Sequence, residues 1–218
     1  MSAGPARAGV AVDVASAVLL CAAAGMVDAV GFVRHGAFAA NMTGNSVLMA
    51  IALAQRDLPR AVDCGAMLAW FYAGVLVGRL AWTFGRGRET APLLLETLLL
   101  GACAMVVAER SLALGITALA MGVQGAALSR FAGVTLSTVV VTSTMVRIGE
   151  ANADALVGRL RGNEPAGHAP LRLLGGSWLA YAAGAAAAVL MGPATPVPVV
   201  VAALLVALVT GLRHVHRP

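Results

Sequence analysis

The sequence is poor in charged and aromatic side chains. Charged residues make up 11% of its 218 residues and aromatic residues 5%, whereas 60% are hydrophobic. An ordinary soluble domain carries roughly 25% charged and 45–50% apolar residues. The mean hydropathy of +0.86 therefore excludes a soluble fold of this size. Because a transmembrane helix needs about 20 mostly apolar residues, the chain has room for six to eight spans and for no extramembrane domain.

Cysteines and the common catalytic motifs are equally scarce. Cys21, Cys64 and Cys103 are odd in number and lie in or beside apolar runs, where a thiol behaves as a small hydrophobe, so we expect no disulfide framework. The chain has no Walker loop, H-E-x-x-H, G-x-S-x-G or Cys-x-x-Cys motif. We therefore expect no enzyme, no cofactor and no metal site. The four histidines fall in predicted loops or the tail: His35, His168, His214 and His216.

Lysine is absent, so all 15 basic residues are arginines, and they are scattered singly. That scatter argues against a nucleic-acid surface and favours a role in orienting loops at the membrane. We expect contact with membrane lipids, a small-molecule or ion substrate if the chain transports one, and no nucleic acid; homo-oligomerisation stays open.

Eight apolar segments predict an all-α, polytopic membrane helix bundle. They lie at about 12–33, 36–55, 61–84, 91–108, 111–129, 133–146, 171–191 and 195–212. The sixth is short, and the second is interrupted by polar residues around Gly44. Either these two are full spans, giving eight, or they are short, broken or re-entrant, leaving six full spans. The N-terminal 24 residues resemble a signal peptide, but the apolar run continues to Val33, which favours an uncleaved first span.

The distribution of arginines orients the bundle. With eight spans and a cytoplasmic N-terminus, ten arginines lie inside and five outside; with six spans the split is twelve to three or eleven to four, depending on Arg110. Both arrangements put the two termini in the cytoplasm, with the chain crossing the plasma membrane. The stretch of about 149–170 is the longest polar one and is expected to be a connector.

The single membrane domain of residues 1–218 contains a predicted duplication, with one repeat at about 12–109 and a second at about 111–213. Asp28 matches Gln124 and Arg34 matches Arg130 at an offset of 96, Thr43-Gly44-Asn45 matches Thr142-Ser143-Thr144 at 99, and Phe71–Gly74 matches Tyr181–Gly184 at 110. Chance similarity between Ala/Gly-rich helices is the alternative. Four full spans in each half would make the repeats parallel, and three spans plus a re-entrant segment would make them inverted.

Asp28 is the strongest candidate for chemistry. A carboxylate inside a span costs about 2.5–3.5 kcal/mol on insertion scales and normally faces the bundle interior with a partner. It could exchange a proton or bind a cation. The alternatives are a structural ion pair with Arg34 and a hydrogen-bonded clamp between helices.

Polar side chains cluster in two further places. Asn41, Thr43 and Asn45 surround Gly44, and a helix broken there would expose groups able to bind a solute. Thr142 and Thr144, with Gln124, repeat the feature in the second half. We predict one substrate site from these residues and Asp28, with Arg34 and Arg130 as ion-pairing or gating residues; interhelical hydrogen bonding is the alternative.

Other features have mainly structural interpretations. Glu96 follows Pro92 closely, so we expect it near a helix N-terminus, favoured by the dipole, with a second buried carboxylate as the alternative. Gly74-x-x-x-Gly78 and Ala180-x-x-x-Gly184 predict close helix packing.

Two signatures carry a family resemblance. Asp28-Ala29-Val30-Gly31-Phe32 leading to Asn41-Met42-Thr43-Gly44-Asn45, and Met121-Gly122-Val123-Gln124-Gly125-Ala126-Ala127 leading to Thr138–Thr144, resemble the YoaK family, also called DUF1275 or UPF0700, over roughly residues 12–212. The family usually has Asn where this chain has Gly125 and Gly where it has Ser143. The resemblance implies a bacterial inner-membrane protein with about six or seven spans and supplies no substrate.

These observations leave competing functions. The leading hypothesis is a secondary transporter or permease for a small solute, with a polar site between two repeats. The alternative is a non-transporting membrane scaffold or assembly protein, in which the polar motifs only lock helices together. A channel is the third hypothesis, although no ring of charge or filter motif supports it.

Overall fold

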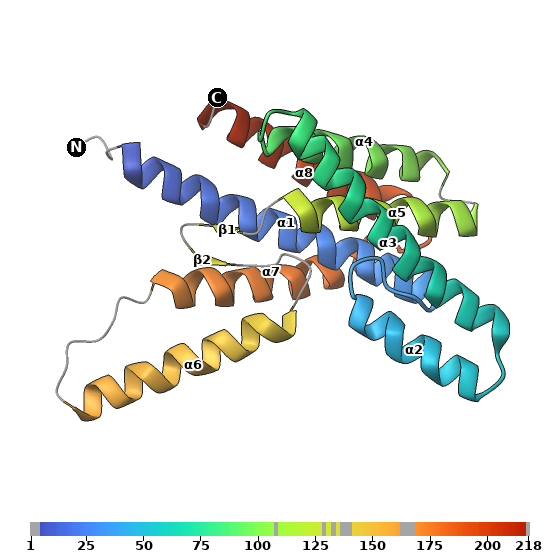
Figure 1. Ribbon diagram of the computed structural model, residues 1–218, viewed down its shortest axis with the longest axis horizontal. Helices are drawn as coiled ribbons and strands as arrows, with labels where there is room; N and C mark the ends of the chain where they lie inside the picture. The colour runs from blue at the N-terminus through green and yellow to red at the C-terminus, as the bar shows by residue number, and fades with distance from the viewer. Residues whose placement is uncertain are drawn as a thin grey trace.

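The computed structural model describes residues 5–106, 109–127, 130–131, 134–135, 141–161 and 169–216. The described part is almost entirely helical (Figure 1). Its elements are α1 (Pro5–His35), α2 (Met42–Ala54), α3 (Leu58–Phe84), α4 (Thr90–Met105), α5 (Arg110–Ala127), β1 (Arg130–Phe131), β2 (Val134–Thr135), α6 (Val141–Leu160), α7 (Ala169–Leu190) and α8 (Val197–His216). The two-residue strands pair antiparallel.

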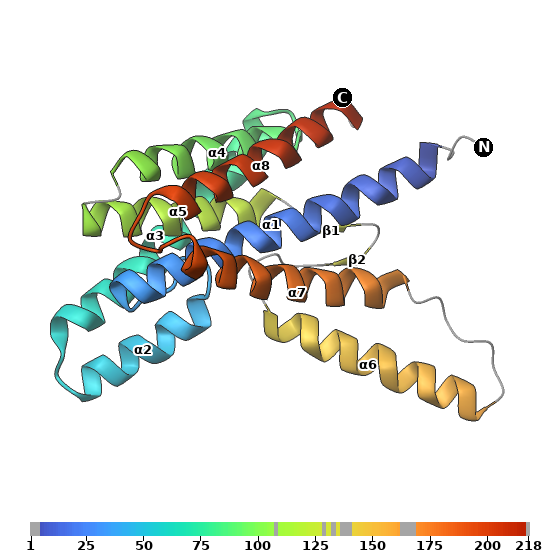
Figure 2. The same ribbon diagram turned by 180° about the vertical axis from the view of Figure 1, so that it is seen from behind.

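The helices lie roughly along one axis, and both chain termini lie at the same end of the bundle (Figures 1 and 2). We call this end the terminal end and the other the distal end. In both views α1, α2, α4 and α7 run toward the distal end, whereas α3, α5, α6 and α8 run back.

Four described helices are long and apolar enough to cross a membrane. They are Gly9–His35, Leu58–Phe84, Leu173–Leu190 and Val197–His216. Three more apolar helices are shorter: Met42–Ala54, Thr90–Met105 and Leu112–Ala127. The structure therefore agrees with a helical membrane bundle, and the six full spans stay a prediction.

The central helix is α1, which packs along α7 on one side and α8 on another. Helix α5 lies against α3 and α4, α8 lies against α4, and α6 and α2 flank the bundle on α7 and α3. The main apolar core joins α1 to α4, α5, α7 and α8 through small and medium side chains such as Ala17, Leu20, Leu100, Met121 and Val206.

Two helix pairs approach so closely that only glycine fits at the crossing. A Cβ atom on Gly25 of α1 would lie 2.0 Å from the carbonyl oxygen of Tyr181 in α7, and one on Gly184 would lie 2.1 Å from that of Ala22. In the other pair, a Cβ on Gly74 of α3 would lie 2.1 Å from the carbonyl oxygen of Leu119 in α5. The predicted small-residue packing motifs are thus confirmed at Gly74 and Gly184, because backbones this close leave no room for a side chain.

The chain turns back on itself between α1 and α2. Gly36, at φ +73°, ends α1 with its N–H bonded to the carbonyl of Phe32 at 2.8 Å, a conformation that glycine adopts without strain. Residues 36–41 then return beside α1, so closely that a Cβ on Gly31 would lie 2.8 Å from the carbonyl oxygen of Ala37. Helix α2, with 13 residues, spans only about 20 Å and is shorter than the membrane core.

Three expectations require correction. The second apolar segment is interrupted before Met42 and not at Gly44, which lies in the first turn of a continuous α2. The polar stretch after residue 149 is not a connector throughout, because α6 continues to Leu160 through good helix formers such as Ala, Leu and Arg. Glu96 lies in the second turn of α4, beyond the N-terminal amides, and its side chain is fully buried.

Candidate functional site

The carboxylate of Asp28 joins three parts of the chain. Its Oδ1 accepts hydrogen bonds from the backbone N–H groups of Ala40 at 2.6 Å and Asn41 at 3.3 Å, and its Oδ2 accepts one from the hydroxyl of Tyr181 at 2.5 Å. The side chain is only 3% exposed. Asp28 thus connects α1 to the returning segment and to α7, which makes it the hydrogen-bonded clamp that the sequence left as an alternative.

Asn45 fixes the same segment from the other side. Its Oδ1 accepts from the N–H of Phe38 at 2.8 Å and its Nδ2 donates to the carbonyl of Phe38 at 2.7 Å. The ring of Phe38 stacks on that of Phe32 with centroids 4.7 Å apart. The side chain of Asn45 therefore replaces the backbone partners that Phe38 lacks, as irregular backbone at membrane depth requires.

Asn41 begins α2. Its side-chain oxygen accepts from the N–H of Gly44 at 3.0 Å, the pattern of a helix N-cap. With Asp28 on the neighbouring amides, a carboxylate lies at the N-terminus of a short helix inside the bundle. That is the place where a helix dipole favours negative charge, so an anionic group of the protein itself occupies a position suited to an anionic ligand.

The structure brings together only part of the predicted site. Asp28, Asn41 and Asn45 meet around residues 38–41, whereas the side chain of Thr43 is exposed on α2. Gln124 is fully buried and donates from Nε2 to the carbonyl of Leu20 at 3.3 Å. Leu20 precedes Asp28 by eight residues, which is about 12 Å along a helix, so Gln124 lies away from the Asp28 cluster.

Three other predicted residues belong to the α5–α6 region. Thr144 is buried, 4% exposed, on α6. The side chains of Thr142 and Arg130 lie outside the described residues.

Arg34 is not among the partners of Asp28, so the proposed ion pair between them is wrong. Six residues separate the two on one helix, which places them on different faces. Arg34 instead lines a small pocket at the distal end with His35, Cys103 and Thr117. Val199, at the start of α8, completes its wall.

Tyr181 is the partner that the sequence analysis missed. It lies 153 residues from Asp28, and within an Ala/Gly-rich apolar helix it matched Phe71 as a repeat position. Only the close approach of α1 and α7 at Gly25 brings its hydroxyl to the carboxylate.

Comparison with known proteins places the chain in a family. The family model described as "Protein of unknown function (DUF1275)" matches residues 16–212. The chain belongs to the DUF1275 family. A similar protein is the UPF0700 transmembrane protein YoaK of Bacillus subtilis (strain 168), 29% identical over 141 residues, which are 60% of this chain. The match covers 63% of YoaK, slightly less than two thirds of its length. No solved structure matches.

The family match and the apolar helices together identify a transmembrane protein. The resemblance inferred from the sequence signatures is confirmed.

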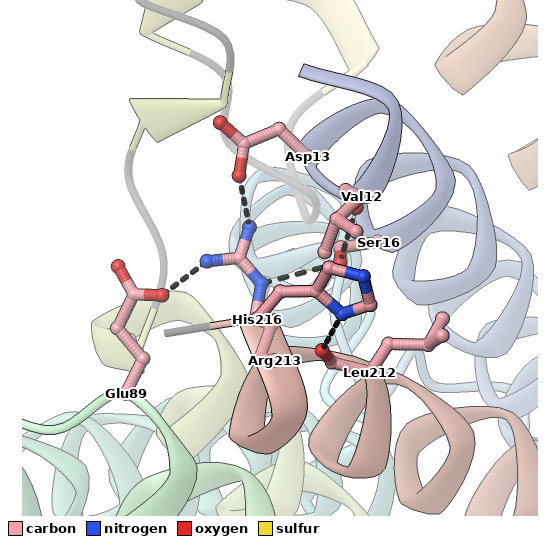
Figure 3. A network of polar contacts seen from close by, with 7 residues as sticks. All are labelled: Val12, Asp13, Ser16, Glu89, Leu212, Arg213 and His216. Carbon is pink, nitrogen blue, oxygen red and sulfur yellow. Dashed lines mark hydrogen bonds and ion pairs between the residues drawn. The ribbon is translucent and has the colours of Figure 1, made fainter. Parts of the chain in front are cut away.

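A second polar cluster of this DUF1275 protein closes the terminal end of the bundle (Figure 3). The guanidinium of Arg213, 1% exposed, pairs with Asp13 of α1 at 2.9 Å and with Glu89, which precedes α4. Its Nε donates to the hydroxyl of Ser16 at 3.2 Å, and that hydroxyl donates to the carbonyl of Val12 at 2.7 Å. Three helices are thereby joined by one buried cation.

Arg213 lies among His214, His216 and Arg217, a local pattern typical of a polar tail. Asp13, an acid at the start of an apolar run, was the signal for a buried partner. Pairing it with Arg213 requires the tertiary contact of α1 with α8, across 200 residues.

Proposed function

We propose that this DUF1275 protein is a secondary transporter for a small solute, formed by two inverted repeats of three spans and one shorter helix each. Residues 5–105 and 110–216 would be the two halves. The observation that carries the proposal is the geometric equivalence of the two halves.

The equivalence is most precise at the helix crossings. The contacts where α1 crosses α7 recur where α5 crosses α3. A Cβ on Gly25 would lie 2.0 Å from the carbonyl oxygen of Tyr181, and one on Gly122 would lie 2.1 Å from that of Phe71. Likewise, a Cβ on Gly184 would lie 2.1 Å from the carbonyl oxygen of Ala22, and one on Gly74 would lie 2.1 Å from that of Leu119. Equivalent residues of α1 and α5 are 97 positions apart, and equivalent residues of α3 and α7 are 110 apart. Equal contacts at constant offsets are what a twofold relation between halves produces.

The directions of the helices support inversion. Helices α1, α2, α3 and α4 run outward, outward, back and outward from the terminal end, and α5, α6, α7 and α8 run in the opposite sense at each step (Figures 1 and 2). Inverted repeats of this kind are common in secondary transporters, with the substrate near the midplane where the halves meet.

The two ends of the bundle correspond as well. Glu89 and Arg213 meet at the terminal end, and Val199 and Cys103 line the distal pocket. Glu89 and Val199 are 110 positions apart, as are Cys103 and Arg213, and Ser16 and Ala113 are 97 apart. Equivalent residues of the two halves thus form an ion network at the terminal end and line a pocket beside Arg34 at the distal end. Alternating access requires two such ends that differ in closure.

The arginines fit six spans. In this arrangement α3 and α6 end, and α4 and α7 begin, at the terminal end, whereas α1 and α2 end, and α3 and α5 begin, at the distal end (Figure 1). The distal helix ends carry or adjoin Arg34, Arg56, Arg60 and Arg110. Eleven of 15 arginines are then on the terminal side, which the positive-inside rule makes cytoplasmic. We propose the bacterial plasma membrane with both termini inside.

The polar cluster of Asp28 joins the two halves and has no counterpart at the equivalent crossing. At the offset of 97, Asp28 corresponds to Gly125, and at 110, Tyr181 corresponds to Phe71, so the crossing of α5 with α3 has neither the carboxylate nor the hydroxyl. The crossings replace the match of Asp28 with Gln124, which used an offset of 96. We propose one solute site, at Asp28, the N-terminus of α2 and Tyr181. A proton would bind the carboxylate of Asp28, and an anionic solute would compete with that carboxylate for the amides of Ala40 and Asn41.

The scaffold hypothesis has one observation in its favour. Asp28 and Asn45 direct their hydrogen bonds to backbone groups of the chain, as a purely structural lock would. Thermal stability and flux together separate the two functions.

The test is solute-induced current or internal pH change in proteoliposomes that carry the protein, across amino acids, sugars, carboxylates and metal cations. We expect one class to give a response above protein-free liposomes, and Asp28→Asn, which keeps the shape of the side chain, to reduce it at least tenfold. Wild-type liposomes that respond to no class, or a response unchanged in Asp28→Asn, would contradict the proposal for that site.

A further inference from the structure

Glu96 is a buried carboxyl group outside the Asp28 cluster and the Arg213 network. It lies in α4, its side chain is 0% exposed, and no hydrogen-bond donor of the described residues reaches either carboxyl oxygen. The buried face of α4 that it shares is otherwise apolar, with Leu93, Leu100 and Cys103.

The register of the neighbouring helices explains this isolation. Helix α8 runs antiparallel to α4: Glu89 pairs with Arg213, and 14 residues further along each helix, about four turns, Cys103 and Val199 line one pocket. Glu96 is midway between Glu89 and Cys103, which places it at the level of Val206, also fully buried. The nearby hydroxyl of Thr210 donates to the carbonyl of Val206 on its own helix at 2.9 Å.

Helix α5 carries no charged residue at the level of Glu96. Cys103 lies 3.6 Å from the carbonyl of Ala113, so the antiparallel register brings Glu96 to the level of Ala120, which is fully buried. The ionisable residue of α5 is Arg110, at its first position. The hydroxyl of Thr117 donates within its own helix, to the carbonyls of Ala113 and Leu114.

The other charged groups on neighbouring elements are engaged elsewhere. Arg213 of α8 is held by Asp13 and Glu89, and Glu89 precedes Glu96 by seven residues, about 10 Å along the helix. On α3 the guanidinium of Arg79 lies 4.2 Å from the centre of the Trp82 ring, while Arg60 and Asp63 belong to its other end. His214 and His216 are exposed at the end of α8.

The side chain of Glu96 is shielded from bulk solvent, and no cation of the described residues contacts it. Nothing in these surroundings offsets the desolvation of an ionised carboxylate, which makes the neutral acid the favoured form. We propose that Glu96 is a proton-binding site in the middle of the bundle, separate from Asp28, that holds its proton while α4 packs against α8. The site deepens the proposed transport function, because a proton released when the two halves separate would couple solute flux to a pH gradient. Glu96 can hold its proton whether or not the protein transports a solute.

Binding of the proton to Glu96 can therefore be tested in the absence of a transported solute. Infrared spectra of the purified protein in lipid nanodiscs at neutral pH should contain the carbonyl stretch of a protonated carboxylic acid. This band should disappear in Glu96→Gln and persist in Asp28→Asn, the matched control. Spectra of the wild type and Glu96→Gln that agree in this region would overturn the proposal.

Addition of sodium tests whether the ligand of Glu96 is a proton or a metal cation. Adding sodium chloride at constant pH should leave the acid band unchanged, with potassium chloride as the control for ionic strength. A band that declines with sodium alone would overturn the assignment of a proton as the ligand in favour of a metal cation.

Stability gives an independent measurement. Because Glu96 has no partner among the described residues, Glu96→Leu should leave the fold intact and raise Tm by a few degrees, since an apolar side chain replaces an unpaired polar one. A fall in Tm of ten degrees or more would indicate a partner that stabilises the carboxylate and would contradict the proposal. Flux that fails while the acid band is present would count against the transport function alone.

Discussion

At the scale of single residues, buried polar side chains in this protein stabilise backbone that has no regular secondary structure. Asp28 and Asn45 supply acceptors and donors to residues 38–41, which would otherwise leave amide groups unpaired away from water. Each unpaired group costs about 1–3 kcal/mol. The returning segment is therefore expected to be stable only while both side chains are present.

Removing the carboxylate should be costly. Asp28→Ala leaves the N–H groups of Ala40 and Asn41 and the hydroxyl of Tyr181 without their acceptor, so we expect a loss of about 3–5 kcal/mol. Tyr181→Phe, which removes one donor, should cost about 1–2 kcal/mol. Thermal melts in detergent measure both. Equal Tm values for Asp28→Ala and the wild type would contradict the clamp.

The two polar residues of α2 should differ sharply. Asn45→Ala removes both bonds to Phe38 and should lower stability by about 2 kcal/mol, whereas Thr43→Val, at an exposed position, should change it by less than about 0.5 kcal/mol. Hydrogen exchange should also accelerate at Phe38 and Ala40 in the first variant only. If Thr43→Val were the more damaging change, Thr43 would belong to the core of the site after all.

At the scale of elements, helix crossings without side chains hold the bundle together. Helices packed through glycine are stabilised by close backbone contact, since apolar helix faces gain no hydrophobic free energy over lipid. Such a crossing tolerates no added methyl group when the opposing atom is a backbone carbonyl.

Matched glycines should therefore respond alike. Gly184→Ala and Gly74→Ala each place a Cβ 2.1 Å from a carbonyl oxygen, so the helices must separate, and we expect each to lose at least about 3 kcal/mol. Gly211→Ala in α8, with no atom within 4 Å, is the control and should be neutral or gain up to about 1 kcal/mol. Melting curves that separate the two crossing variants by several kcal/mol would argue against their equivalence.

The ion network at the terminal end is an interaction between elements. Arg213→Ala removes the cation that pairs with the buried Asp13 and the partly exposed Glu89 and should cost about 3–5 kcal/mol. Arg159→Ala, at an exposed position of α6, should lie within about 0.5 kcal/mol of the wild type. Denaturation in detergent compares them, and similar stabilities for both variants would mean that the network is not formed in the membrane.

At the scale of the whole molecule, the sequence predicts the fold class better than it predicts which helices contact one another. Long apolar runs suffice for a membrane helix bundle because the bilayer imposes helices on them. Repeat matches in Ala/Gly-rich helices are ambiguous by one position, and the proposed offset of 97 depends on the crossings at Gly25 and Gly122. The roles of Tyr181, Arg213 and Glu96 depend on contacts between helices distant in sequence, which local patterns do not carry.

The central claim, that two inverted halves alternate access between their ends, is tested most directly by distances measured with pairs of spin labels. Cys21, Cys64 and Cys103 are buried and are first replaced by alanine. One pair, Arg88→Cys with Val215→Cys, reports on the terminal end, and another, Met105→Cys with Val197→Cys, on the distal end. Each pair joins the two halves, and all four positions are exposed.

Glu89→Gln, which weakens the contact with Arg213 while Asp13 remains, provides the perturbation. In nanodiscs we expect this variant to have a longer distance at the terminal end and a shorter one at the distal end. Distances that stay the same at both ends, or that lengthen together, would contradict alternating access and leave a rigid membrane scaffold.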